Sequence, residues 1–190
     1  MSHFVGLLFS DNYELLDKYD ENIEVEPYIK YTKEEAVEKA KKDQQELYDL
    51  LLSQQIHLKE ERNITNEEDW EQVKKWGYKI DDFNNIISTY NPNSKWDWYS
   101  VGGRWSGYLP LKDGTFVDTA FVSEVDWDKY KETEISPFCF ITPEGDWFES
   151  ANMGWWCITS NENPSWDTVF DNYLATLDDD TIVNTIDFHI

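Results

Sequence analysis

The sequence predicts an α+β fold, with an antiparallel or mixed sheet, helices on one face and a helical insertion. Short apolar segments bounded by turn sequences predict strands at the start, in the second half and at the end of the chain. Longer segments with apolar residues at helical spacing predict helices between them. The 190 residues suit a single domain over 1–190, with the helical insertion at about 32–89.

The first strand is expected from His3 to Phe9, a short apolar segment rich in aromatic residues. It ends at Ser10-Asp11-Asn12, which is a turn sequence. A segment of this kind is typical of a buried strand, so we expect the first strand to be central in the sheet. The acidic segment 20–31, interrupted by Pro27, is expected to be an irregular connection on the surface.

A long helix is predicted from about Lys33 to about Gln55. Thr32 can act as its N-cap, and Glu35 three residues later completes a capping box. The apolar residues that follow at helical spacing are Ala36, Val37, Ala40, Leu47, Tyr48, Leu51 and Leu52.

Two shorter helices are expected in the same region. Asn66 can cap a helix that runs to Trp76 and carries Trp70 and Val73 on one face, and Gly77 stops it. A third helix is expected over 82–88. The charge-rich segment 32–89 thus forms an insertion between the first strand and the aromatic segment that follows.

Strands are expected again over 104–111, 138–142 and 147–148. The turn sequences Asp113-Gly114 and Pro143-Glu144-Gly145 bound them, which favours antiparallel hairpins.

The chain is expected to end with a helix and a strand. Asn163 caps the helix and Pro164 opens it; its apolar stripe comprises Trp166, Val169, Phe170, Tyr173, Leu174 and Leu177. The segment 181–190 alternates, which predicts a strand held in the sheet. Its one face carries Ile182, Ile186, Phe188 and Ile190, and its other face carries Thr185, Asp187 and His189.

The charge of the chain is strongly negative, with 16 basic and 39 acidic residues and a formal charge of −23. Such a surface repels phosphate backbones and anionic lipids, so neither direct nucleic-acid binding nor membrane binding is expected. It suits a partner protein with a basic surface, for example one whose nucleic-acid groove the carboxylates occupy. The alternative is that the charge serves solubility.

The sequence contains few motifs that indicate a cellular location or an enzyme class. Cys139 and Cys157 form no Cys-x-x-Cys motif, and no apolar stretch resembles a signal peptide or approaches the roughly 20 residues of a membrane span. A cytoplasmic chain with buried free thiols is therefore expected. Walker, Gly-x-Ser-x-Gly and zinc-ligand cysteine motifs do not occur, so no cofactor or metal is expected and an enzyme is not favoured.

The segment 95–109, KWDWYSVGGRWSGYL, concentrates aromatic residues around a glycine turn. Its candidate ligand- or partner-binding residues are Trp96, Asp97, Trp98, Tyr99, Gly102, Gly103, Arg104 and Trp105. In one interpretation, Arg104 and the amides of Gly102 and Gly103 receive a phosphate or carboxylate while the rings stack on a planar ligand. In the other, Arg104 pairs with Asp97 and the rings pack as a corner of the core. Stacking of the guanidinium on an indole is also expected.

The candidate catalytic residues are His3, Asp187 and His189. If the first and last strands are neighbours, two imidazoles and a carboxylate share one face, a set that can bind zinc or manganese or perform acid–base chemistry. The alternative is two histidines at strand ends near the surface, each bonded to a carboxylate.

Several motifs carry a resemblance to a known family. They are the opening Met1-Ser2-His3-Phe4, the central Trp96-Asp97-Trp98-Tyr99 and Gly102-Gly103-Arg104-Trp105, and Met153-Gly154-Trp155-Trp156 with the closing Asp187-Phe188-His189-Ile190. Together they resemble a family of uncharacterised bacteriophage and prophage proteins, over nearly the whole chain apart from the helical segment. The resemblance implies a genomic setting more than a mechanism.

The leading hypothesis is a phage-encoded acidic accessory protein that binds and modulates a host protein, for example as an anti-CRISPR-like inhibitor of host defence. The alternative is a nucleotide-binding or small anionic ligand-binding protein, or a hydrolase, that uses the aromatic Gly-Gly-Arg-Trp pocket. A third hypothesis is a virion-associated structural protein.

Overall fold

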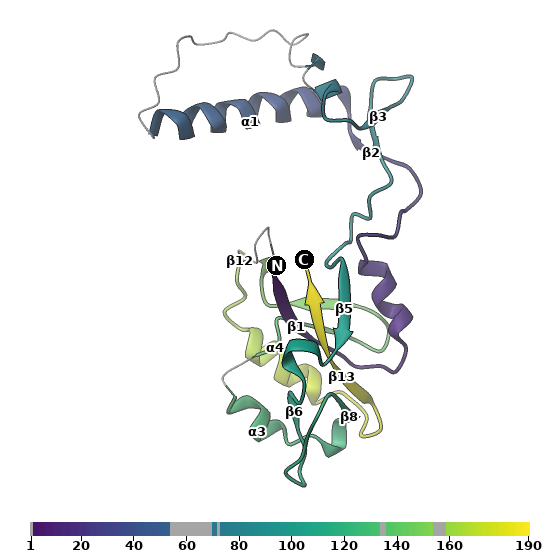
Figure 1. The fold of residues 1–190 in the computed structure, drawn as a ribbon, viewed down its shortest axis with the longest axis vertical. Helices are drawn as coiled ribbons and strands as arrows, with labels where there is room; N and C mark the ends of the chain where they lie inside the picture. Colours follow the sequence, from purple (N-terminus) through teal and green to yellow (C-terminus); the bar gives the residue numbers. More distant parts are fainter. Residues whose placement is uncertain (1, 54–69, 72, 134–135, 154–158) are drawn as a thin grey trace. The chain divides into compact units, whose positions relative to one another are not determined.

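The computed structural model describes residues 2–53, 70, 71, 73–133, 136–153 and 159–190. The chain forms two compact units (Figure 1): unit 1 comprises Met1–Ile23 and Asn91–Ile190, and unit 2 comprises Glu24–Tyr90. The predicted α+β fold is confirmed. Unit 2 corresponds to the expected insertion but begins earlier and contains strands as well as helix, so the insertion is not purely helical. The interpretation of residues 1–190 as a single domain stays a prediction.

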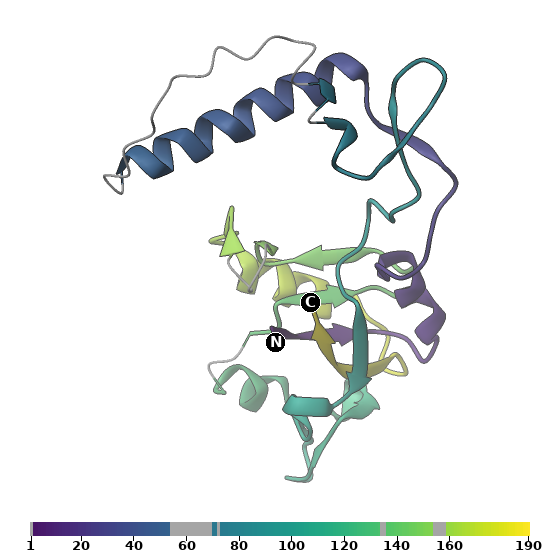
Figure 2. The ribbon, with the colours of Figure 1, turned by 45° about the horizontal axis from the view of Figure 1, so that its top comes forward.

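Unit 1 is built on a mixed sheet with the order β10-β9-β1-β13-β5, in which β8 also pairs with β13 (Figures 1 and 2). The first strand is central, as predicted, and the last strand lies beside it. The β1–β9 pair is parallel, and the other pairs are antiparallel. The strands are β1 (His3–Leu8), β5 (Trp98–Val101), β8 (Thr119–Phe121), β9 (Cys139–Ile141), β10 (Trp147–Glu149) and β13 (Ile182–His189).

One face of this sheet is covered by the helices α3 (Trp127–Lys131) and α4 (Trp166–Leu174). Alternate residues of β1 and β13 point into this core because successive side chains of a strand lie on opposite faces. The buried residues that form it include Val5, Leu7, Phe9, Phe140, Phe170 and Val183. The two α-helices therefore lie on one face, as the sequence predicts, although α3 itself is not among the predicted helices.

The opposite face packs against η1 (Tyr13–Tyr19), a 3-10 helix that follows the turn after β1. Leu16 and Tyr19 of η1 are buried there together with Ile186 and Phe188 of β13. The alternation predicted for the last strand is thus confirmed for Ile186 and Phe188, which face η1, whereas Val183 points into the helix-covered core on the other face.

The ends of unit 1 that flank the insertion are bonded to each other. The buried side-chain amide of Asn91 donates to the carbonyl oxygens of Lys18 and Asp20, at 3.0 Å each. The N–H of Glu21 donates to the carbonyl oxygen of Trp96 at 2.9 Å. The segments at which the chain leaves and re-enters unit 1 are therefore bonded directly to each other.

The strand predicted over 104–111 is wrong. Residues Gly103–Trp105 form a 3-10 turn, η2, and only Leu109–Pro110 is a strand, β6, which pairs with β7 (Phe116–Val117). The backbone has positive φ at three glycines, Gly102, Gly103 and Gly107, so it cannot continue as a strand. A further 3-10 turn, η3 (Val122–Glu124), follows β8.

The predicted hairpin between β9 and β10 is confirmed, since these strands pair antiparallel across Gly145, whose φ is 83°. The last helix begins later than predicted, at Trp166 with Ser165 as N-cap residue. Asn163 precedes it, and its side chain accepts the N–H of Ser165. Beside it the short strands β11 (Asn152–Met153) and β12 (Thr159–Ser160) pair with each other.

Unit 2 contains the long helix α1 (Lys33–Ser53), close to its predicted bounds. The capping box is confirmed: Thr32 N–H donates to Glu35 Oε2 at 2.8 Å, and Glu35 N–H donates to Thr32 Oγ1 at 3.3 Å. Ala36 and Ala40 face a small core with Trp70, Val73 and Ile86. The side chains of Leu47, Tyr48, Leu51 and Leu52 lie outside the described residues.

The rest of unit 2 is a three-stranded antiparallel sheet of β2 (Tyr28–Tyr31), β4 (Ile86–Ser88) and β3 (Lys79–Ile80), in that order. The surface connection expected over 20–31 therefore ends in a strand. The helix predicted over 82–88 is wrong, because Asp81 accepts the N–H groups of Phe83 and Asn85 and forms a tight turn that enters β4. Of the helix expected over 66–76, the described residues 70, 71, 73 and 74 are helical.

Cys139 is a buried free thiol, and Cys157 lies outside the described residues. Within the described ranges, no helix combines the length and the apolar character that a membrane span requires.

Candidate functional site: a histidine–carboxylate cluster beside a glycine turn

The strand register brings three sequence-distant segments together at one end of the sheet of unit 1. His3 of β1 lies opposite His189 of β13, which in turn lies opposite Trp98 of β5. Two residues before His189 in β13, Asp187 lies opposite Ser100 of β5. Directly opposed residues of neighbouring strands project from the same face, so these side chains form one cluster. The first and last strands therefore pair, and this pairing places the three candidate catalytic residues next to one another.

His3 and Asp187 form a buried pair. The Nδ1 atom of His3 lies 2.7 Å from Oδ1 of Asp187, and their side chains are 5% and 3% exposed. The other oxygen of Asp187 accepts the backbone N–H of Arg104 at 2.9 Å. This carboxylate therefore bonds with both oxygens, one to β1 and one to the glycine turn.

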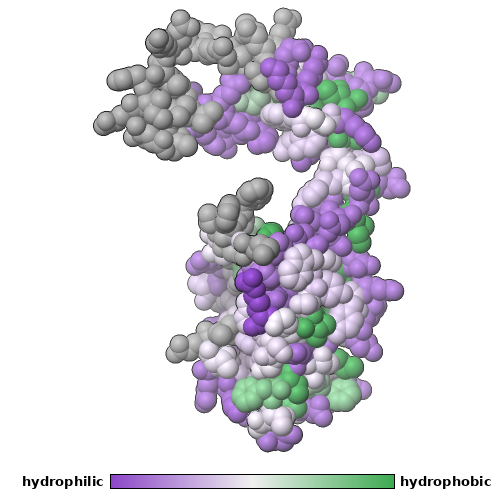
Figure 3. All heavy atoms as spheres, viewed as in Figure 1, coloured by the Kyte–Doolittle hydropathy of each residue, from purple (hydrophilic) through white to green (hydrophobic). Residues whose placement is uncertain are grey.

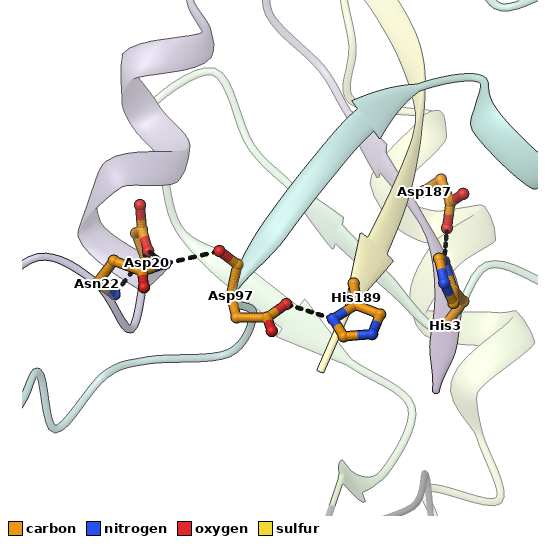
Figure 4. A network of polar contacts seen from close by, with 6 residues as sticks. All are labelled: His3, Asp20, Asn22, Asp97, Asp187 and His189. Carbon is orange, nitrogen blue, oxygen red and sulfur yellow. Dashed lines mark hydrogen bonds and ion pairs between the residues drawn. The ribbon is translucent and has the colours of Figure 1, made fainter. Parts of the chain in front are cut away.

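His189 has a different carboxylate as its partner (Figure 4). Its Nδ1 atom lies 2.5 Å from Oδ1 of Asp97, and the backbone N–H of Asp97 donates to the carbonyl oxygen of His189 at 3.1 Å. The side-chain amide of Asn22 holds Asp97 in turn, donating to its carbonyl oxygen at 2.6 Å and to the carboxylate of Asp20 at 2.9 Å. Each imidazole is thus oriented through Nδ1 by its own carboxylate.

The aromatic rings of the cluster are in contact. The ring centroids of His3 and His189 are 4.9 Å apart at an interplanar angle of 77°. The indole of Trp98 stacks on His189 at 5.1 Å and 17° and meets His3 edge-on at 5.2 Å. Trp98 is 44% exposed, whereas the side chain of His189 is 12% exposed, so the indole separates the imidazole from solvent.

The glycine turn fits tightly over Asp187. Gly102 and Gly103 have φ values of 70° and 52°, and a Cβ atom on Gly103 would collide with the Asp187 carboxylate and with Oγ of Ser100. Only glycine permits this backbone conformation with this approach. The turn binds a carboxylate through the backbone N–H of Arg104, and this carboxylate is the chain's own Asp187 and not a ligand. The N–H of Gly102 is likewise occupied, because it donates to the carbonyl oxygen of Thr185 at 2.8 Å.

The side chain of Arg104 reaches the surface. The ion pair expected between Arg104 and Asp97 is wrong, because Asp97 bonds to His189 instead. The expected stacking of the guanidinium on an indole is also wrong, because the stacked partner of Trp98 is His189. Within the described part of the chain, the Arg104 guanidinium makes no hydrogen bond, ion pair or ring contact.

The remaining candidate residues divide between core and surface. Trp96 is 4% exposed and packs on Phe188, and Tyr99 is half-buried beside both. Trp105 is half-buried against the helix-covered core. The aromatic segment therefore combines the two interpretations, since Trp96 fills the core while Trp98 and Arg104 face outwards.

A metal site does not follow from this geometry. Asp187 bonds to His3 and Asp97 bonds to His189, so the expected set of two imidazoles and one carboxylate is split into two pairs. Among the described residues, no three His, Cys, Asp or Glu side chains are arranged to hold a metal ion.

The negative charge is concentrated in unit 1. This unit has 23 acidic and six basic residues, a formal charge of −17, whereas unit 2 has 16 acidic and ten basic residues, a formal charge of −6. On the face shown in Figure 3, hydrophilic residues predominate and hydrophobic residues occupy separate areas.

Comparison of the chain with protein-family models, with curated proteins and with solved structures finds no match in any of the three.

Proposed function

We propose that the chain is a phage-encoded acidic accessory protein whose negative charge attracts a basic host protein and whose interface with that protein includes Trp98 and Arg104 of unit 1. The observation that carries this proposal is the placement of these two side chains. Trp98 is 44% exposed, and Arg104 is exposed with no ion pair among the described residues, in a unit whose formal charge is −17.

Tryptophan and arginine are the residue types that most often dominate the energy of protein–protein binding. Here they belong to adjoining segments, β5 and η2, at the edge of the sheet. Val101 of β5 and Phe121 of β8 are also exposed along this edge and add apolar area. A partner that covers the edge would bury an aromatic anchor and a guanidinium together.

The surrounding charge favours a basic partner. A formal charge of −17 attracts a positively charged protein at long range and repels acidic competitors, so it raises the association rate and narrows the choice of partner. A protein that binds nucleic acid or nucleotides through a basic groove has the required chemistry. Components of phage defence that act on nucleic acid are partners of this kind.

The phage setting rests on the resemblance described above. The motifs that carry it include His3, the aromatic segment from Trp96 to Trp105, and the segment from Asp187 to Ile190. These motifs are distant in the sequence, and they meet in the cluster and the adjoining turn. Their convergence supports a shared role at this end of unit 1.

Affinity capture from a bacterial host lysate tests the proposal. The full chain is expected to retain a basic protein at low ionic strength and to lose it as salt rises, because exposed charges are screened. Trp98→Ala and Arg104→Ala are each expected to weaken capture at least about tenfold, the effect of an interface hot spot.

Phe83→Ala is the matched control, because Phe83 is an aromatic residue of unit 2 that is 83% exposed. It should leave capture unchanged. Capture that persists equally in Trp98→Ala and Arg104→Ala, or a lysate that yields no basic partner even at low salt, contradicts the proposal.

A further inference from the structure

His189 carries a buried ring nitrogen that lacks a hydrogen-bond partner. Its Nδ1 atom bonds to Asp97, whereas its Nε2 atom is buried and unpaired among the described residues. Buried polar atoms in proteins are almost always paired, so an unpaired one at a surface cluster indicates a missing partner. Four other residues, Trp96, Tyr130, Tyr173 and Thr185, also have an unpaired buried polar atom among the described residues, and of the five His189 is the one whose ring stacks on an exposed indole. His189 is separated from solvent by the indole of Trp98.

The orientation of the imidazole determines which partner it accepts. Because a carboxylate occupies Nδ1, the proton is held on Nδ1, and Nε2 is an acceptor in the neutral ring and a donor in the imidazolium. A hydroxyl group satisfies the first form, and a phosphate oxygen satisfies the second. A ligand with both a sugar hydroxyl and a phosphate therefore suits His189 in either form.

Trp98 provides a planar surface beside this nitrogen. Its indole lies parallel to the imidazole at 17° and is 44% exposed. Nucleic-acid bases stack readily on exposed tryptophan. Nε2 is buried in the structure, so a ligand reaches it only when neighbouring side chains move, and exposed side chains such as Trp98 move on the nanosecond timescale. A base that stacks on Trp98 would lie beside His189.

Arg104 provides the charge that a phosphate requires. Its backbone N–H donates a hydrogen bond to the Asp187 carboxylate at 2.9 Å, which fixes the backbone over Asp187. Its exposed guanidinium has no hydrogen-bond or ion-pair partner among the described residues. A guanidinium presents a rigid set of donors that matches phosphate oxygens. The exposed guanidinium is therefore free to bind a phosphate, although unit 1 as a whole has 23 acidic and six basic residues.

We infer that Trp98, Arg104 and His189 form a binding site for a nucleoside phosphate. Trp98 stacks on the base, Arg104 binds the phosphate, and Nε2 of His189 bonds to the sugar hydroxyl or to a phosphate oxygen. This site goes beyond the proposed binding of a basic protein, because its ligand is a small anion.

Titration of the full chain with AMP, GMP, CMP and UMP tests the inference. At least one nucleotide is expected to shift the imidazole nitrogen resonances of His189 in NMR spectra and to change tryptophan fluorescence. Adenosine and inorganic phosphate are partial probes, and each is expected to bind at least about tenfold more weakly than the complete nucleotide.

Arg104→Lys and Trp98→Ala separate the two halves of the site. Arg104→Lys keeps the charge but loses the planar donor set, and it is expected to weaken nucleotide binding by about tenfold. Trp98→Ala should weaken the nucleotide but not inorganic phosphate. Lys112→Arg is the control, because it changes an exposed basic side chain of the same unit that bonds to the carbonyl oxygen of Ser123 instead.

Salt dependence distinguishes this site from protein binding. The net charge of unit 1 repels an anion, so nucleotide binding is expected to strengthen as ionic strength rises from about 0.01 M to about 0.15 M, where the Debye length falls from roughly 30 Å to 8 Å. Capture of a basic protein is expected to weaken over the same range. The inference is wrong if the imidazole resonances of His189 stay unchanged with all four nucleotides at millimolar concentration. It is also wrong if inorganic phosphate binds as tightly as the nucleotide.

Discussion

His3 and His189 lie opposite each other across β1 and β13 in an edge-on contact, with ring centroids 4.9 Å apart, yet each bonds to a different carboxylate. Asp187 belongs to β13 itself, whereas Asp97 directly precedes β5. Polar contacts at this end of the sheet therefore connect the first strand, the last strand and β5. The cluster has a structural role in addition to the binding roles proposed for it.

Asp187→Ala is expected to lower the free energy of unfolding of the chain by about 3 kcal/mol, the usual effect of removing one partner from a buried pair. The substitution leaves His3 and the N–H of Arg104 without their acceptor. Urea denaturation followed by circular dichroism measures the change. Asp180→Ala, at an exposed acidic residue, is the control and should change stability by less than about 0.5 kcal/mol. Equal stability of the two variants would contradict a structural role for the pair.

Gly103→Ala and Gly114→Ala form a matched pair that separates backbone strain from collision. Both glycines have positive φ, 52° and 90°, but a Cβ atom meets the Asp187 carboxylate at Gly103 and meets nothing within 4 Å at Gly114. Gly114→Ala should cost about 1 kcal/mol in unfolding free energy from strain alone. Gly103→Ala should cost more, and it should also perturb the imidazole NMR signals of His3. Equal costs would show that the turn has room over Asp187.

Trp96 and Trp98 differ in burial although only Asp97 separates them. Trp96→Ala is expected to reduce unfolding free energy by about 3–5 kcal/mol, because it removes a buried indole that is 4% exposed and packs on Phe188. Trp98→Ala should cost about 1 kcal/mol, since Trp98 is 44% exposed. Chemical denaturation of both variants checks this order, and the reverse order would exclude Trp98 as a surface residue.

Alkaline pH is expected to destabilise the fold. Burial raises the pKa of Tyr108 to about 12 and the pKa of Tyr130 well above its ordinary 10.0. The folded chain thus keeps these phenols neutral, and their contribution is complete below pH 10, where the unfolded chain is also neutral. It is lost as pH rises from about 10 through about 12.

Denaturation curves across that pH range, together with tyrosinate absorbance, check this expectation. Tyr108→Phe removes one of the groups and should make stability fall less steeply with pH. A stability that is constant up to pH 12 would contradict it.

Cys139 is expected to resist alkylation in the folded chain. Burial raises the pKa of its thiol well above the ordinary 9.0, so little thiolate forms at neutral pH. Iodoacetamide should modify Cys139 only after denaturation, and mass spectrometry of the peptide that contains Cys139 measures this. Rapid labelling of the native chain would show that the residue is accessible.

The parts of the fold that local patterns determine could be predicted from the sequence. The alternation of 181–190 predicts that Asp187 and His189 share a face, and the capping box at Thr32 predicts the start of α1. These patterns act within a few residues, so they do not depend on tertiary contacts. In contrast, the aromatic residues of 104–111 are typical of a strand, but positive φ at Gly103 and Gly107 makes this segment a turn.

The partners in the candidate site could be predicted only in part. Adjacency of His3 and His189 follows if the terminal strands pair, yet the sequence does not give the register. Asp97 has two possible cationic partners, Arg104 nearby in sequence and His189 far from it. The nearer one was expected, but β5 pairs with β13 and places His189 at Asp97. Such a choice depends on strand pairing, which no local pattern contains.

The bonds from Asn91 to Lys18 and Asp20 have a consequence for engineering. They clamp the two exit points of unit 1 together, so a linker of a few glycines and serines should be able to replace Glu24–Tyr90 without opening the sheet. Unit 2 could then be removed or replaced by another domain, and the shortened chain would retain the histidine cluster in a smaller protein.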